Sequence, residues 1–169
     1  MIDSKRIKST LKFLDIEYNT HLLHSKNSEI PVLYAKMALL EYCGWLEQTF
    51  DEIARNCIQR KPRTSAPQKL LEEKIKTTYG LRYSQNVRPL LAYGLGVLRL
   101  SEVEKKLDAT GDLTLLKSHL GTISKKRNEA AHTFIAGTTR SFDEPSTTIA
   151  YLNEHEPRLR KLWELVCEE

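Results

Sequence analysis

The chain has 169 residues, which is long enough for a single domain over residues 1–169 to bury a core without disulfide or metal staples. Hydrophobic residues make up 40% of the chain and charged residues 28%, and 7 Gly and 6 Pro are too few for a collagen-like or disordered sequence. With 26 basic and 22 acidic residues the net charge is +4, which permits a polyanionic partner but does not require one.

The three cysteines, Cys43, Cys57 and Cys167, are an odd number and lack the spacing of a disulfide scaffold or a metal site. We therefore expect reduced thiols in a cytoplasmic compartment and no bound metal, with Cys43 and Cys57 buried in helices. No run of 18 apolar residues occurs, and the N-terminus is polar and basic, so the sequence predicts neither a membrane span nor an export signal.

Two amphipathic helices are predicted in the first third of the chain. The first runs from about Asp3 to His24 and packs on the rest of the bundle as an N-terminal helix over residues 1–25. The second opens at Pro31 and continues to Arg60, with an apolar seam suited to the centre of a bundle or to contact with a second subunit. The seam residues are Leu39, Cys43, Leu46, Phe50, Ile53 and Cys57.

Two further helices are predicted in the middle of the chain. A short one spans residues 68–78, and a longer one runs from Val87 to about Leu107. The longer helix contains Gly94 and Gly96, which each cost about 1 kcal/mol relative to Ala. Glycines at these positions suit a place where another helix crosses closely.

The last third of the chain predicts a helix that begins at Asp112, an irregular loop or small hairpin over 133–143, and a final helical region over 149–166. We expect Pro157 to break or kink that final region. Because no strand pattern or internal repeat is present, the predicted fold class is all-α, an up-and-down bundle of about five to seven helices. The core stripe of the helix after Asp112 comprises Leu113, Leu116, Leu120 and Ile123.

Polar residues interrupt the end of that stripe. Continued by four, three and four residues, the stripe reaches Arg127, Ala130 and Phe134, so a guanidinium takes a place that the pattern reserves for an apolar side chain. Asn128 and His132 lie four residues apart, share one face and are placed to hydrogen-bond. Arg127 and His132 are five residues apart, about 140° around a regular helix. They can converge on one ligand only if the long Arg127 side chain wraps around the helix, if the helix distorts, or if a second subunit supplies part of the site.

An Arg-Asn pair followed by His at this fixed spacing is expected by chance only about 0.01 times in a chain of this composition. The segment from Arg127 to His132, which follows a leucine-rich helix, resembles the signature of the HEPN superfamily. Together with the run from Leu91 to Leu98, it is similar to the RiboL-PSP-HEPN-like branch of that superfamily. The resemblance covers about residues 30–168.

The resemblance implies a HEPN-like, metal-independent endoribonuclease without a cofactor, acting as a homodimer in which the motifs of two subunits face each other. It makes Arg127 and His132 the catalytic pair and Asn128 their polar helper. An acidic or polar residue on an earlier helix often assists in this family, and Glu41 and Glu47 are both candidates. Such proteins act in toxin–antitoxin or phage-defence systems, so the implied partners are RNA, a second copy of the chain and a cognate antitoxin protein.

The implied chemistry requires no metal. The ribose 2′-OH attacks its own phosphate and leaves a 2′,3′-cyclic phosphate, with His132 as general base or acid and Arg127 neutralising charge on the phosphoryl oxygens. Lys125 and Lys126 either hold the RNA backbone or are ordinary solvated lysines. The alternatives to the ribonuclease are a non-catalytic HEPN-type module that binds RNA, a nucleotide or a protein, and a plain helical interaction domain.

Overall fold

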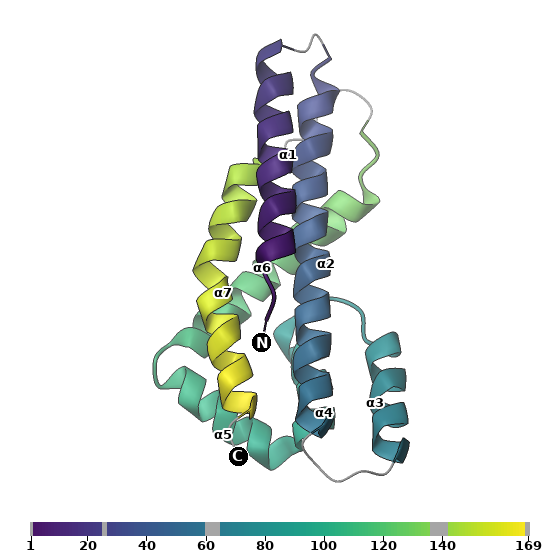
Figure 1. Cartoon of the computed structure of the whole chain (residues 1–169), viewed down its shortest axis with the longest axis vertical. Coiled ribbons are helices and arrows are strands. Elements are labelled where there is room, and N and C mark those ends of the chain that lie inside the picture. The colour runs from purple at the N-terminus through teal and green to yellow at the C-terminus, as the bar shows by residue number, and fades with distance from the viewer. Residues whose placement is uncertain (1, 25–26, 60–64, 136–141, 168–169) are drawn as a thin grey trace. The chain divides into compact units, whose positions relative to one another are not determined.

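The computed structural model describes residues 2–24, 27–59, 65–135 and 142–167 (Figure 1). These residues form seven α-helices and one π-helical turn and contain no strand, so the prediction of an all-α, bundle-like fold is confirmed. The elements are α1 (Lys5–His24), α2 (Glu29–Gln59), α3 (Ser65–Thr77), the π-helical turn η1 (Tyr83–Val87), α4 (Arg88–Leu95), α5 (Val97–Asp108), α6 (Asp112–His132) and α7 (Pro145–Cys167).

The chain divides into two compact units, and α2, α6 and α7 each contribute a segment to both of them. The first, which we call the α1 unit, comprises Asp3–Trp45 and Lys125–Glu156. The second, the α3–α5 unit, comprises Met1–Ile2, Leu46–Ser124 and Pro157–Glu169. That the whole chain folds as a single domain stays a prediction.

In the α1 unit, α1 lies along the first part of α2 (Figure 1). At one end of this helix pair, the Trp45 indole donates a hydrogen bond to the backbone carbonyl of Asp3 at 3.0 Å. At the other end, the rings of His21 and Tyr34 stack with their centroids 5.4 Å apart. The two helices are therefore joined at both ends, over an apolar core that includes Ile7, Leu11, Leu14, Leu39, Tyr42 and Cys43.

The α3–α5 unit combines an apolar core with ion pairs between its helices. The Arg55 guanidinium of α2 binds the Glu72 carboxylate of α3 through two contacts, of 2.7 and 3.1 Å. The Arg88 guanidinium of α4 binds Glu104 of α5 in the same bidentate way, at 2.8 and 3.1 Å. Such part-exposed pairs orient the helices, whereas most of the stabilisation comes from apolar burial. The core includes Leu46, Phe50, Ile53, Cys57, Leu91, Leu100, Leu107, Leu116 and Leu120.

The predicted helix over residues 87–107 is divided in the structure. The backbone turns at Gly96, whose φ of 85° lies in the left-handed region that favours glycine, and this residue separates α4 from α5. Gly94 does have the role predicted for both glycines, because it lies where another helix passes closely. A Cβ on Gly94 would lie 2.9 Å from the Cys57 Cβ and 3.1 Å from the Ala54 carbonyl oxygen on α2. Close helix approach therefore explains Gly94, and backbone conformation explains Gly96.

Of the break or kink predicted at Pro157, the break is wrong, because α7 is continuous through this residue, and the kink stays a prediction. A proline inside a helix removes one backbone hydrogen bond and costs about 3 kcal/mol, so the flanking turns have to offset that loss by packing. Just before the proline, the buried Glu156 carboxylate accepts a hydrogen bond from the Ser4 hydroxyl and pairs with the Lys8 ammonium, both at 2.6 Å. Just after it, Leu159 is fully buried.

Cys43 and Cys57 are buried as predicted, and no disulfide joins the three cysteines. Within the residues that the structure describes, no helix is both long enough and apolar enough to cross a membrane. Of the predicted loop over 133–143, residues 136–141 lie outside the described ranges, and none of the others belongs to a strand.

Replacement of Gly94 by Ala is expected to destabilise the protein by about 1–3 kcal/mol, because the new methyl group would overlap Cys57 and the α2 backbone. The matched control is Gly121→Ala on α6, where a Cβ meets nothing within 4 Å. That control should stabilise the protein by about 0.5–1 kcal/mol, since alanine favours a helix more than glycine does. Urea unfolding of both variants measures the two changes, and equal effects would contradict the close approach at Gly94.

Candidate functional site

The last turns of α6 lie in the α1 unit and carry the polar motif. Ala130 is fully buried, which fixes the inward face of these turns. Arg127 is half-buried, whereas Asn128 and His132 are exposed. The predicted stripe therefore continues through Ala130 but does not reach Phe134, which is 89% exposed because α6 ends at His132.

The motif residues occupy two different environments. Asn128 and His132 lie on one face, as their spacing predicts, but the hydrogen bond that this spacing permits is not formed. Neither side chain has a hydrogen-bond partner among the described residues, so both can receive a ligand. The helix is α-helical through His132, so helix distortion does not bring Arg127 toward the imidazole.

The two lysines before the motif differ from each other. Lys125 is exposed to solvent. Lys126 is partly buried, and its ammonium pairs with the Asp143 carboxylate and lies 3.1 Å from the Tyr151 hydroxyl of α7. Burial alone would lower the pKa of Lys126, but the hydrogen bonds to Asp143 and Tyr151 outweigh it and raise that pKa. Lys126 is thus paired within its own chain, and its predicted contact with the RNA backbone stays a prediction.

A third lysine, which the sequence analysis did not single out, lies beside the motif. The Lys36 ammonium of α2 donates a hydrogen bond to the backbone carbonyl of Thr133 at 2.9 Å. Thr133 directly follows His132, so this contact brings a positive charge to the C-terminal end of α6, where the helix dipole favours cations. In the sequence, Lys36 is one polar residue within an apolar helical pattern. No local signal marks it as part of a site, because its partner Thr133 lies 97 positions away.

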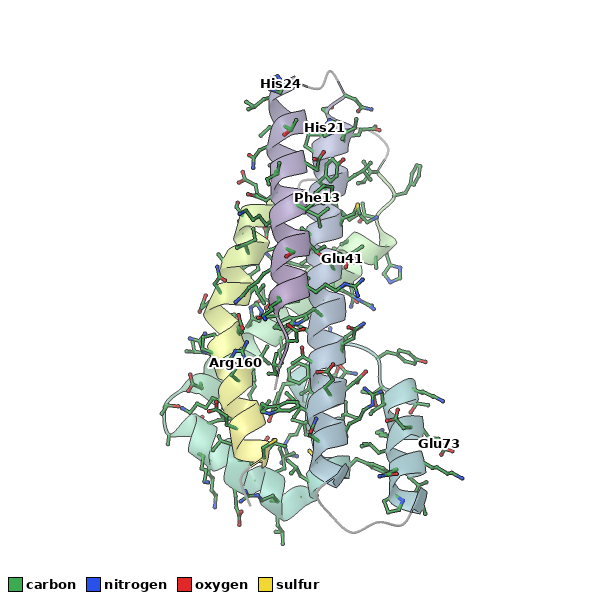
Figure 2. The ribbon with its side chains drawn as sticks, viewed as in Figure 1. Phe13, His21, His24, Glu41, Glu73 and Arg160 are labelled. Carbon is green, nitrogen blue, oxygen red and sulfur yellow. The ribbon has the colours of Figure 1, made fainter. Side chains whose placement is uncertain are left out.

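The two acidic candidates fall in different units. Glu41 is exposed on α2 in the α1 unit, the unit that holds the motif (Figure 2). No hydrogen bond or ion pair joins Glu41 to a motif residue within the described part of the chain. Glu47 belongs to the α3–α5 unit, where burial raises the pKa of Asp51 to about 6, Arg55 opposes the change and Glu47 adds to it. Of the two candidates, only Glu41 shares a unit with His132.

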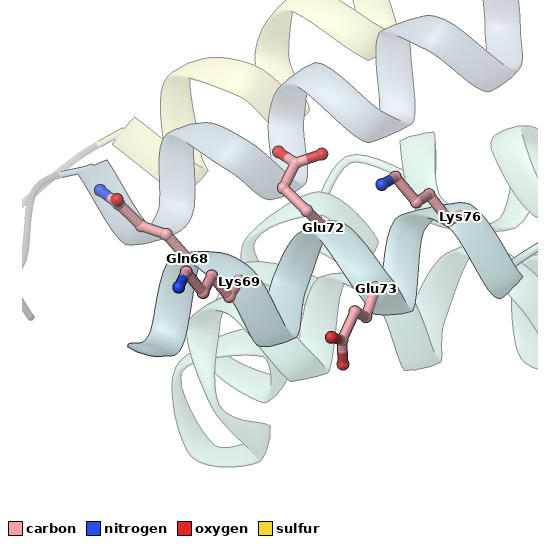
Figure 3. Close-up of a pocket in the computed structure, with 5 residues that line it drawn as sticks. All are labelled: Gln68, Lys69, Glu72, Glu73 and Lys76. Atoms are coloured by element: carbon pink, nitrogen blue, oxygen red, sulfur yellow. The ribbon is translucent and has the colours of Figure 1, made fainter. Parts of the chain in front are cut away.

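A pocket of about 360 Å³ lies on α3 and does not include the motif (Figure 3). Its lining mixes both signs of charge, and one member, Glu72, is already paired with Arg55. Among the described residues, no group of three or more His, Cys, Asp or Glu side chains is arranged to hold a metal ion. The lining residues of the pocket are Gln68, Lys69, Glu72, Glu73 and Lys76.

Comparisons of the chain with protein-family models, with curated proteins and with solved structures found no match. The resemblance to the HEPN superfamily therefore depends on the motif residues and their place on α6. The roles that it implies for Arg127, Asn128 and His132 stay predictions.

Replacement of Lys126 by Met is expected to lower the free energy of unfolding by about 1 kcal/mol, because Asp143 and Tyr151 lose their cationic partner. The matched Lys125→Met variant should stay within about 0.5 kcal/mol of the wild type, since Lys125 is exposed. Urea unfolding at one salt concentration measures both values. A Lys125 variant that is destabilised as much as the Lys126 variant would contradict this division of roles.

Proposed function

We propose that this protein is a HEPN-type endoribonuclease that cleaves RNA without a metal ion, with Arg127, Asn128 and His132 in its active site. The observation that carries the proposal is the pair of exposed side chains, Asn128 and His132, on the last turn of α6 without partners among the described residues. By contrast, His119 and His155 are buried in the fold. A polar pair kept out of the packing leaves its hydrogen-bonding groups available to a solvated, charged ligand.

The reaction uses the RNA's own 2′-hydroxyl as the nucleophile. The 2′-oxygen forms a bond to phosphorus while the bond from phosphorus to the 5′-oxygen breaks, and the 2′-hydroxyl proton is removed as the leaving oxygen gains one. His132 acts at one of these two proton transfers. Arg127 neutralises the charge that develops on the phosphoryl oxygens, and Asn128 positions the phosphate or the imidazole.

A second copy of the chain completes the site. Arg127 is half-buried and His132 is exposed about 140° further around a regular helix, which favours a site in which the two groups at one phosphate come from different chains. A twofold axis near the end of α6 would set Arg127 of each copy opposite His132 of the other. Such a dimer forms two equivalent sites.

The charges near the motif favour RNA as the ligand. Lys36 and Lys125 add two cations to Arg127 in the same unit, whereas Lys126 is paired with Asp143. The family resemblance adds a biological setting in toxin–antitoxin or phage-defence systems, with a cognate antitoxin protein as a further partner. Cleavage should therefore weaken as salt concentration rises, because RNA binding releases counterions.

The His132→Ala variant is expected to cleave RNA about 10²- to 10⁴-fold more slowly than the wild type, because it loses a group that transfers protons. The matched control is His24→Ala, which removes another exposed histidine, at the end of α1 (Figure 2). Cleavage of a mixture of RNAs is followed in EDTA, and the products are examined for 2′,3′-cyclic phosphate ends.

EDTA should leave wild-type cleavage unchanged, and a 2′-deoxy nucleotide at the cleaved position should block it. The proposal fails if His132→Ala cleaves as fast as His24→Ala, or if the wild type leaves all the RNAs intact. RNA that is bound but not cut by the wild type would instead support the non-catalytic binding module.

Mixing the inactive Arg127→Ala and His132→Ala chains is expected to restore about a quarter of wild-type cleavage. About half of randomly assorted dimers contain one chain of each kind, and each such dimer has one site with both wild-type residues. The measurement is the rate after the two variants are unfolded and refolded together. A mixture as inactive as its components, or a monomeric protein in sedimentation, would show that the site does not span two copies.

A further inference from the structure

Phe134 is the most exposed of the large apolar side chains that the structure describes, with 89% of its surface accessible. It follows His132 by two residues, which span at most about 7 Å of extended chain. An aromatic ring that is presented to water buries apolar area when another flat group stacks on it. The protein therefore offers a flat apolar surface within reach of the imidazole.

The backbone that carries this ring is held in place on the residue before it. The Thr133 carbonyl accepts the hydrogen bond from the Lys36 ammonium at 2.9 Å, and the Thr133 hydroxyl donates to the Glu129 carbonyl at 2.6 Å. These contacts join the segment to both α2 and α6. Phe134 is thus presented from an anchored point of the chain.

The same contacts leave a cation beside the ring with capacity to bind. A lysine ammonium has three N–H donors, and Lys36 uses one of them for the Thr133 carbonyl. Its other donors have no partner among the residues that the structure describes. An ammonium with remaining donors is a suitable ligand for a phosphate oxygen.

We propose that Phe134 and Lys36 form a nucleotide-binding subsite next to His132, in which the ring stacks on one base and the ammonium binds the neighbouring phosphate. The subsite rests on the proposed function and adds where this chain holds the RNA beside the cleaved bond. Only a base that is free of its complementary strand can offer its face to the ring, so the subsite takes an unpaired nucleotide.

The surroundings of Phe134 favour a base over a second copy of the chain as the group that covers it. Protein interfaces are enriched in aromatic residues but depleted in lysine at their core, whereas grooves for single-stranded nucleic acid combine aromatic rings with cations. Phe134 is joined through Thr133 to the Lys36 ammonium and follows the exposed His132. Aromatic and cationic groups are therefore combined on one short segment.

The test measures binding of a short, fluorescein-labelled, single-stranded RNA of mixed sequence by full-length His132→Ala protein, in which cleavage does not interfere. Addition of Phe134→Ala should weaken binding by roughly 5- to 150-fold, the range for loss of one stacked base. Phe134→Trp should retain affinity, and Phe134→Leu should behave like Phe134→Ala because leucine is apolar without a flat π-face. Lys36→Ala should make the slope of log affinity against log salt concentration less steep, by about the amount expected for one phosphate contact.

The matched control is Leu98→Ala, which removes an 85% exposed apolar side chain on α5 in the other unit and should leave affinity unchanged. In the following comparison, the parent is the His132→Ala protein without a further substitution. The same RNA annealed to its complement should bind equally to the parent and to the protein that also carries Phe134→Ala. Circular dichroism checks that each variant is folded.

The subsite is overturned if the parent protein does not bind the RNA, if Phe134→Leu binds as tightly as the parent, or if Phe134→Ala and Leu98→Ala have the same effect. A loss of dimer in sedimentation of Phe134→Ala would also overturn it, by assigning the ring to contact between copies. Failure of the proposed function is a separate result. It appears as RNA that the wild type binds but leaves intact, and the binding series then still decides the subsite.

Discussion

The buried face of α2 is the constraint on which the rest of the fold depends. This 31-residue helix supplies core side chains to both compact units, with Leu39 and Cys43 in one and Phe50 and Ile53 in the other. Each large apolar side chain removed from water contributes about 1.5–3 kcal/mol, so the orientation of α2 about its own axis is strongly determined. Once that face is buried, Lys36 reaches the end of α6 from a neighbouring face, and Glu41 is left exposed.

The end of α6 combines packing with exposed polar groups in little more than one turn. Ala130 is fully buried, while Asn128 and His132 remain in water on the other side of the helix. A small residue at the buried position lets the helix lie close to its neighbours, and the Lys36 contact holds the backbone that follows. A helix end that is anchored in this way would suit the proposed site, because little ordering would be left for the moment of binding.

Several charged side chains of this protein pair with one another inside the fold. Lys126 pairs with Asp143, the Lys8 ammonium pairs with the buried Glu156, and the Lys161 ammonium lies 2.7 Å from the Asp112 carboxylate at the start of α6. The net charge of +4 is therefore a weak guide to a polyanion site. For the proposed RNA site, what matters is which cations remain near His132, and only the arrangement of the helices separates Lys125 from Lys126.

The sequence by itself determined the features that depend on neighbours within a few turns. Helical spacing predicted α2, its seam and the shared face of Asn128 and His132, because these follow from local periodicity. A local capping signal predicted that α6 starts at Asp112. Only the tertiary structure decided that Pro157 stays inside α7, that Gly96 divides a helix, and that Lys36 caps the backbone after His132. Packing energy from distant segments can outweigh a local preference, and a contact across 97 positions leaves no periodic trace in the chain.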